Sequence, residues 1–247
     1  MKVTIVTPVL NCINYMSGCI ESVLGQDYPD LEYIIVDGGS VDGTLSVIEK
    51  YRENISRVIN TKDNGSYDAL NKGIALATGD LIGLLNADDL LADPSVVSAV
   101  VALVKREHCN IVYGDLDIIT RNGREKVVRR WRPGRYNPVK LRFGWMPPHP
   151  TLYIGHELLR KYLPYAQHYE ASADYDLILR AFGDTAANIR YLNKLMVKMR
   201  SGGQSNGSSI KLFRTFLADY RILEANGVPL PLLVAGIKKL RKLRQLC

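Results

Sequence analysis

The sequence has few cysteines, and they are widely spaced. Its 247 residues contain four, Cys12, Cys19, Cys109 and Cys247, with no CxxC pair among them. A small secreted fold that depends on disulfides carries a dense cysteine framework, which this pattern does not provide. We therefore expect a reducing cytoplasm as the location, and thiols that serve as packing groups.

Long apolar runs are also absent. No segment approaches the roughly 20 apolar residues of a spanning helix. The opening MKVTIVTPVLN lacks a small-residue cleavage site after its apolar part. Internal repeats and low-complexity segments are missing too. We expect a chain that stays where it is made, with one core domain and a modest appendage.

The charge balance lacks an acidic excess. There are 32 Lys and Arg residues against 25 Asp and Glu residues, which gives a net charge of +7. A positive balance suggests an anionic partner such as a nucleotide, a nucleic acid or a membrane surface. Charge alone does not choose among these partners.

Short apolar segments alternate with helical patterns. The segments KVTIVTPVL, LEYIIVDGGS and DLIGLLNADD are too short for buried helices and fit buried strands. Helical periodicity follows them at about 15–25, 40–51, 66–80 and 93–106. This alternation predicts an α/β fold with a mostly parallel sheet that is flanked by helices on both faces.

Polar side chains follow the predicted strands. In a parallel sheet, ligands bind at the carboxyl ends of the strands, where loops and helix amino termini meet. The candidates at the ends of the first four strands are Thr7 and Pro8, Asp37, Asp63, and Asp88 with Asp89.

Asp88 and Asp89 place two like charges side by side. Adjacent carboxylates at the end of a buried strand raise each other's pKa unless a cation lies beside them. Carboxylate oxygens suit Mg²⁺ or Mn²⁺, with substrate phosphates and water completing the coordination. A turn that caps the next helix would use the same residues, so the pair alone leaves both interpretations open.

Six segments together carry a resemblance. They are TPVLN, IIVDGGSVDGT, DNGSYDALNKGIALATGD, LLNADD, MPPHPTLY and ADYDLILR. Their order and spacing resemble those of family 2 glycosyltransferases, the inverting enzymes with a GT-A fold that includes many bacterial polysaccharide-biosynthesis enzymes. The resemblance covers residues 1–205. It implies a nucleotide-sugar-binding half at 1–115, an acceptor and catalytic half at 116–205, and a helical tail at 206–247.

The resemblance also assigns the donor site. It implies a nucleotide diphosphate sugar, with a UDP-sugar as the first candidate, and Mn²⁺ or Mg²⁺ held by Asp89. The residues that would contact the donor are Thr7, Pro8, Asp37, Asp63, Asp68, Asn71, Asp88 and His149. His149 would contact the diphosphate or the acceptor, although a packed structural histidine is an equal alternative.

The catalytic base is assigned to Asp174. An inverting transfer needs a base that takes the proton of the acceptor hydroxyl as its oxygen attacks the anomeric carbon. Asp176 would point elsewhere in a helix, because residues i and i+2 do not share a face. Without the resemblance, Asp174 reads as a carboxylate that interacts with the helix dipole.

The expected function is transfer of a hexosyl or N-acetylhexosaminyl group to a saccharide or a lipid-linked acceptor. Such a reaction would belong to surface polysaccharide or glycolipid synthesis. Two other classes are a nucleotidyltransferase and a non-catalytic sugar-nucleotide-binding protein. The first usually has a glycine-rich phosphate loop after its first strand, and TPVLNC lacks one.

Two basic segments offer further surfaces. Arg129, Arg130, Arg132 and Arg135 surround Trp131, which fits a nucleic-acid patch less well than a solvated hairpin beside an anionic donor or lipid phosphate. At residues 230–247, one helical face would carry Leu233, Ile237, Leu240 and Leu243.

The tail pattern predicts an interfacial helix on the inner face of the cell membrane, where lipid-linked acceptors would lie. Its basic residues are Lys238, Lys239, Arg241, Lys242 and Arg244. The alternative is a helix that packs on the catalytic domain or on a second subunit in a homo-oligomer.

Overall fold

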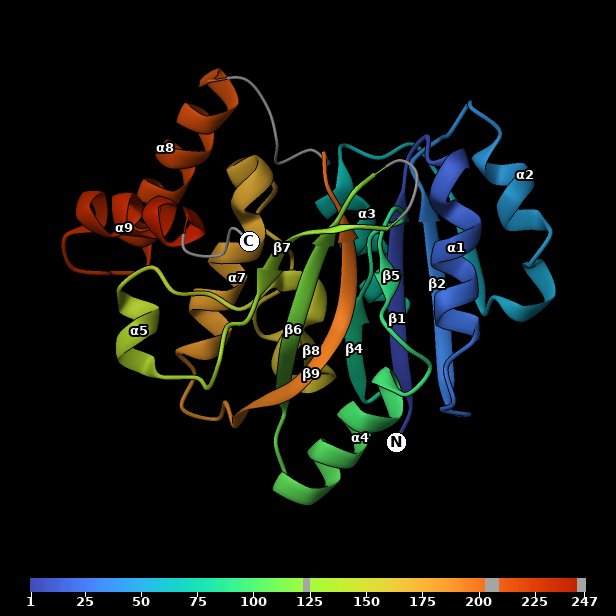
Figure 1. The fold of residues 1–247 in the computed structure, drawn as a ribbon, viewed down its shortest axis with the longest axis horizontal. Helices are drawn as coiled ribbons and strands as arrows, with labels where there is room; N and C mark the ends of the chain where they lie inside the picture. Colours follow the sequence, from blue (N-terminus) through green and yellow to red (C-terminus); the bar gives the residue numbers. More distant parts are fainter. Residues whose placement is uncertain (122–124, 203–208, 244–247) are drawn as a thin grey trace.

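A computed structural model describes residues 1–121, 125–202 and 209–243 of the chain. Helices and strands alternate through its first hundred residues, as the sequence predicts (Figure 1). The boundary predicted between residues 205 and 206 lies outside the described residues.

The first half of the sheet is parallel. Strand β1 (Val3–Val9) lies between β2 (Leu31–Asp37) and β4 (Leu81–Leu84), and β3 (Arg57–Asn60) extends the sheet beyond β2. Every residue of β1 is buried. This burial on both faces is what a continuous apolar, β-branched run predicts for a central parallel strand.

The second half of the sheet is mixed. Strand β6 (Ile111–Ile119) pairs in parallel with β9 (Ile189–Arg200). Antiparallel pairs connect β8 (Tyr153–Gly155) to β4 and β6, β5 (Leu90–Leu91) to β9, and β7 (Val127–Trp131) to β6. The nine strands form one sheet, in which β8 joins the parallel half to the β6–β9 half. The expected parallel character therefore holds best for the first half.

Helices cover both faces of the sheet with two hydrophobic clusters. One cluster includes side chains of α1 (Ile13–Leu24), α2 (Thr44–Glu49) and α4 (Val96–Glu107). The other includes side chains of α3 (Ser66–Ala75) and α7 (Ala173–Phe182). The remaining helices are η1 (Arg52–Asn54), α5 (Pro138–Arg142), η2 (His149–Thr151), α6 (His156–Arg160), η3 (Gln167–Ser172), α8 (Ser209–Ala225) and α9 (Pro231–Leu243).

The two C-terminal helices belong to the core. Ile222 of α8 and Val234 and Ala235 of α9 are buried in the same cluster as α7. The alternative that the tail packs on the domain is therefore correct for this face of α9. Leu233 and Leu240, on the predicted apolar face, are 57% and 64% exposed.

One basic residue of the predicted membrane-facing set lies inside the protein. The Lys238 ammonium is 2.7 Å from Oδ1 of Asp219 on α8 and 3.4 Å from the centre of the Tyr175 ring on α7. Asp219 also accepts a hydrogen bond from Ser172, the residue before α7. The prediction that Lys238 faces a membrane is wrong, because a buried carboxylate holds its charge. Arg244 and the side chain of Lys242 lie outside the described part of the chain.

Two absences hold for the part of the chain that the structure describes. No helix there is both long and apolar enough to cross a bilayer. Cys12, Cys19 and Cys109 are free thiols, as expected, and Cys247 is not among the described residues.

We predict that Asp219→Ala lowers the free energy of unfolding by about 3 kcal/mol or more, because it leaves the Lys238 ammonium buried without its carboxylate. Urea unfolding monitored by circular dichroism measures the change. The matched control is the double variant Asp219→Leu with Lys238→Met, which removes both charges and should recover much of the loss. A single-variant loss that the double variant does not reduce would contradict the assigned ion pair.

Candidate functional site

Parallel pairing brings the ends of β1, β2 and β4 to one edge of the sheet, opposite the edge where the chain begins (Figure 1). Asp37 is the last residue of β2 and is fully buried. Its Oδ2 accepts hydrogen bonds from the backbone N–H groups of Gly39 and Ser40, at 3.0 and 2.9 Å. Its Oδ1 has no hydrogen-bond partner among the residues that the structure describes. A buried acceptor without a donor is costly, so Asp37 is a candidate to bind a ligand N–H or O–H.

The Asp63 carboxylate packs against Gly38, the residue that follows Asp37. A Cβ atom added to Gly38 would come within 2.2 Å of Asp63 Oδ2, so only glycine leaves room for this carboxylate. Asp63 lies three residues beyond the end of β3, and its Oδ1 accepts the Gly65 N–H at 3.0 Å. The loop after β3 thus packs the Asp63 carboxylate against the turn that follows Asp37.

Thr7 and Pro8 do not end their strand, because β1 continues to Val9. The Thr7 hydroxyl is fully buried and accepts a hydrogen bond from Tyr33, at 3.2 Å. This hydrogen bond joins β1 to β2 in the core, and the donor contact expected for Thr7 stays a prediction. Pro8 is buried beside Val36 in the β1–β2 pairing.

Asp88 and Asp89 follow β4 in a tight turn, in which the Asp89 N–H bonds to Asn86 O at 3.0 Å. Both oxygens of Asp89 accept hydrogen bonds, one from the Asn86 side chain and one from the Arg200 N–H. Asp88 is more accessible, with its side chain 22% exposed, and pairs with Arg121 at 3.2 Å. The turn therefore presents one accessible and one buried carboxylate.

Burial, and then the charge of Asp88, raise the pKa of Asp89 to about 7. Two guanidinium groups oppose this effect only in part: Arg121 pairs with Asp88, and the charge of Arg200 acts to lower the pKa of Asp89. Both guanidinium groups lie 4.9 Å from the centre of the Tyr15 ring. Within residues 1–121, 125–202 and 209–243, no three His, Cys, Asp or Glu side chains gather to hold a metal. A divalent ion at this turn would depend on a ligand for its remaining oxygens, as Mg²⁺ commonly does.

Asp174 lies in the first turn of α7, half-buried, and belongs to a cluster of aromatic groups. Its Oδ1 accepts the Tyr175 N–H at 2.9 Å and the Tyr67 hydroxyl at 3.3 Å. Tyr67 stacks on Tyr165 with ring centres 5.4 Å apart. Burial, and then Asp174, raise the pKa of Tyr67, so its hydroxyl keeps the proton that it donates.

The same cluster contains His149. Its Nε2 lies 3.0 Å from the Tyr165 hydroxyl, and the two rings meet edge to face. Burial lowers the pKa of His149, and the nearby Asp174 opposes this shift only in part. His149 is therefore a neutral group that supports Tyr165, which fits the packed alternative.

Helix α3 connects the loop that holds Asp63 to Asp174. It begins at Ser66, directly after the loop that holds Asp63, and its first turn provides Tyr67. Asp68 accepts a hydrogen bond from Gln167 at 3.1 Å, and Asn71 exchanges two hydrogen bonds with the backbone of Tyr165. These contacts hold the segment 165–167 in place, and the donor contacts expected for Asp68 and Asn71 stay predictions.

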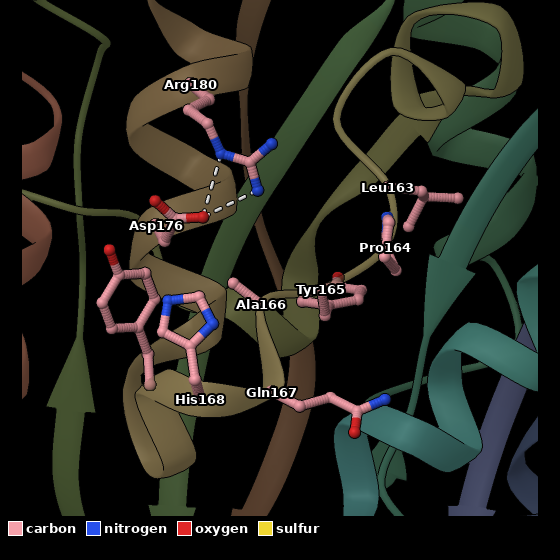
Figure 2. A pocket seen from close by; sticks show the side chains of 9 residues that line it. Leu163, Pro164, Tyr165, Ala166, Gln167, His168, Asp176 and Arg180 are labelled. Atoms are coloured by element: carbon pink, nitrogen blue, oxygen red, sulfur yellow. Dashed lines mark hydrogen bonds and ion pairs between the residues drawn. The ribbon is translucent and has the colours of Figure 1, made fainter.

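A pocket of about 560 Å³ lies on the other side of this segment (Figure 2). Asp176 and Arg180 of α7 point into it and form an ion pair at 2.7 Å. The prediction that Asp176 points away from Asp174 is confirmed, because Asp176 contacts Arg180 whereas Asp174 contacts Tyr67. The other lining residues are Leu163, Pro164, Tyr165, Ala166, Gln167, His168 and Tyr169.

The basic hairpin is solvated, with part of its charge neutralised. Strand β7 pairs with β6, and Arg132 forms ion pairs with Asp115 and Asp117, at 3.2 and 2.7 Å. Arg129 lies over the Trp131 ring at 5.4 Å. A nucleic-acid patch needs accessible cations, and these contacts occupy two of the four arginines.

Sequence patterns missed the groups that surround the predicted acids. Tyr67 and Tyr165 read as apolar positions, and Arg121 and Arg200 lie in segments far from Asp88 along the chain. Only the pairing of β6 with β9 brings both arginines to the end of β4. The sequence held one local signal for these surrounding groups: Tyr67 lies one residue before Asp68, at the polar start of a helix.

Comparison with known proteins identifies the family. Residues 4–164 match the family model described as glycosyl transferase family 2. A "PGL/p-HBAD biosynthesis glycosyltransferase" of Mycobacterium bovis (strain BCG / Pasteur 1173P2) is 31% identical over 208 residues, which cover 82% of this chain and 78% of the relative. The chain therefore belongs to glycosyltransferase family 2.

Solved structures agree on the fold. S. aureus TarS 1-349 in complex with UDP-GlcNAc has a TM-score of 0.70 and 19% identity, over 96% of this chain and 70% of that one. Glucosyl-3-phosphoglycerate synthase from Mycobacterium tuberculosis in complex with Mn²⁺, UDP and phosphoglyceric acid has a TM-score of 0.65 and 19% identity, over 92% and 79%. The chain is a glycosyltransferase with a GT-A fold.

The raised pKa of Asp89 predicts a pH dependence of stability. The folded state keeps the Asp89 proton up to about pH 7, whereas an unfolded aspartate loses it near pH 4. Folding therefore binds a proton between these values, and the free energy of unfolding falls as pH rises through this window, by at most about 1.4 kcal/mol per pH unit.

Asp89→Asn removes this titration and keeps the shape of the side chain. Urea titration in the presence of chelator measures the free energy of unfolding of both proteins. Between pH 5 and pH 7, the value for the unsubstituted protein should fall relative to the value for Asp89→Asn. Parallel stability curves for the two proteins would show that Asp89 titrates normally.

Proposed function

We propose that this glycosyltransferase moves a sugar from a UDP-sugar to a hydroxyl group with inversion at the anomeric carbon. The observation that carries this proposal is the Asp174 carboxylate, half-buried and held by Tyr67 of the helix that leaves the acidic loop. A carboxylate with an accessible face, fixed beside the donor edge, is suited to accept a hydroxyl proton.

The donor base would bind at the end of β2. The free Oδ1 of Asp37 is suited to accept an N–H from a base such as uracil, while Gly39 and Ser40 hold the other oxygen. Asp63 beside it would accept a second polar group of the nucleoside. The UDP complexes of the structural neighbours support this choice of base.

The diphosphate would lie over the turn that holds Asp88 and Asp89. Mn²⁺ or Mg²⁺ bound there would neutralise the departing diphosphate. We assign Asp89 as its ligand, with the accessible Asp88 beside the ion or the donor sugar. Burial and the charge of Asp88 disfavour the deprotonated form of Asp89, so a cation bound nearby would stabilise that form. The Mn²⁺ complexes of a mannosyltransferase and of the phosphoglycerate synthase support a metal.

Asp174 would then take the proton of the acceptor hydroxyl while the acceptor oxygen forms its bond to the anomeric carbon. The bond to the diphosphate breaks on the opposite side, so the configuration inverts. Tyr67 orients the carboxylate through its 3.3 Å hydrogen bond, and neutral His149 fixes Tyr165 beneath Tyr67.

The acceptor would be a saccharide or a lipid-linked sugar that enters from the side of Tyr165. The pocket in Figure 2 shares Tyr165 with the base cluster and offers Tyr169 and Gln167 to a sugar ring. Hexosyl and N-acetylhexosaminyl groups are the sugars that we assign to the donor. We place the reaction in polysaccharide or glycolipid synthesis in the cytoplasm. A chondroitin synthase from Pasteurella multocida, 29% identical over 197 residues that cover 20% of that protein, supports the polysaccharide class.

A panel of radiolabelled nucleotide sugars tests this function. We expect release of UDP and transfer or hydrolysis of the labelled sugar, loss of both in EDTA, and recovery with Mn²⁺ or Mg²⁺. Release of pyrophosphate would indicate a nucleotidyltransferase, and binding without turnover would indicate a sugar-nucleotide-binding protein. Full turnover in EDTA would remove the metal from the proposal.

Asp174→Asn should lower kcat by roughly 10²-fold or more, because the amide keeps the shape of the side chain but cannot accept the proton. Donor affinity, measured by calorimetry with UDP, should stay near that of the unsubstituted protein. Asp30→Asn, on an exposed side chain, is the matched control. An equal loss of UDP binding would give Asp174 a structural role.

A further inference from the structure

Exposed apolar side chains gather at one end of the molecule. Phe143, the residue after α5, is 50% exposed, and Val139 of α5 is 60% exposed. On α9, Leu233 and Leu240 are 57% and 64% exposed. A single exposed apolar side chain is common on a protein surface. A group of large exposed apolar side chains on neighbouring helices more often marks an interaction surface.

The segment that follows α5 is in direct contact with α9. The Arg241 side chain of α9 donates to the Phe143 carbonyl at 3.3 Å. A Cβ atom on Gly144, which has a φ of +73°, would be 3.0 Å from Val234 O and from Lys238 Cβ, so the chain after α5 lies directly on α9. Figure 1 shows α5 and α9 together at the left, opposite α1 and α2.

The same surface is basic. Lys140 and Arg142 of α5 are exposed, and neither α5 nor α9 contains an Asp or Glu. The sequence has no acidic residue at all between Glu125 and Glu157. Asp219, under α9, is 1% exposed and is already paired with Lys238 and Lys239. The positive charge of α5 is therefore directed outward without a compensating carboxylate on either helix.

We propose that this surface docks on an anionic lipid bilayer. We name it the α5–α9 surface and define it by Val139, Lys140, Arg142, Phe143, Leu233 and Leu240. Apolar side chains that lie between basic ones match the boundary between acyl chains and anionic headgroups. The proposal differs from the interfacial helix expected at residues 230–247, because α5 contributes the accessible cations and Lys238 of α9 contributes none.

A second copy of the chain suits the α5–α9 surface less well. A symmetric dimer uses the same patch on both subunits, so Lys140 and Arg142 of one copy would face the same cations of the other. Like charges brought together at an interface disfavour the contact. An anionic bilayer supplies the opposite charge and takes up the apolar side chains.

Co-sedimentation of the full chain with vesicles tests the proposal. We expect binding to vesicles of phosphatidylcholine with phosphatidylglycerol at low salt, weaker binding at high salt, and little binding to phosphatidylcholine alone. Lys140→Glu with Arg142→Glu should lower the partition to anionic vesicles by about tenfold or more. Phe143→Ser with Leu240→Ser should lower it as well, including at high salt.

Matched controls lie on other elements. Lys105→Glu with Arg106→Glu reverses two charges on α4, and Val41→Ser changes a side chain that is 89% exposed in the first half of the chain. These controls should bind vesicles as the unsubstituted protein does. All variants change exposed or partly exposed side chains, and equal thermal unfolding temperatures confirm that they remain folded.

Three results would overturn the proposal: no binding of the unsubstituted protein to anionic vesicles, equal losses in the surface and control variants, or sedimentation velocity that shows a dimer dissolved by the surface variants without vesicle binding. The last result would assign the surface to a second copy. UDP-sugar hydrolysis in solution is measured separately, so its failure would leave the vesicle result intact.

Discussion

The arrangement of the site depends on parallel pairing at the centre of the sheet. Because β1, β2 and β4 run in the same direction, their carboxyl ends meet at one edge, and the acidic loops that follow lie there together. Asp88 and Asp89 are crowded by this geometry. Arg121, two residues beyond β6, pairs with the Asp88 carboxylate, and Arg200, the last residue of β9, donates to the Asp88 carbonyl. The pairing of β6 with β9 brings both arginines to this turn.

Helix α3 connects this edge of the sheet to Asp174 and to the segment 165–167. Its first turn follows the loop of Asp63, and three successive contacts join it to the second half of the chain: Tyr67 to Asp174, Asp68 to Gln167, and Asn71 to Tyr165. Tyr67 therefore holds the Asp174 carboxylate, while Asp68 and Asn71 hold the segment 165–167 beside the loop of Asp63.

The C-terminal helices have a buried side and an exposed side with different roles, which the helical pattern of the sequence does not distinguish. Their inner side is part of the core, where Asp219 neutralises Lys238 and fixes the start of α7 through Ser172. Their outer side leaves leucines exposed next to the cations of α5. One helix therefore contributes both to the stability of the catalytic half and to a surface at its edge.

The sequence alone determined the alternation of strands and helices, the central buried strands and the places of Asp37 and Asp89 at or just after strand ends, whereas Asp174 is assigned only through the family resemblance. Local patterns suffice for the strands, the helices and the first two aspartates, because apolar periodicity and strand-end chemistry are properties of neighbouring residues. Tertiary structure decided what no local pattern contains: the core position of Thr7, the space that Gly38 leaves for Asp63, the hydrogen bond of Tyr67 to Asp174 and the burial of Lys238. Each of these joins residues far apart in the chain, and only the packed fold brings them within a few ångströms.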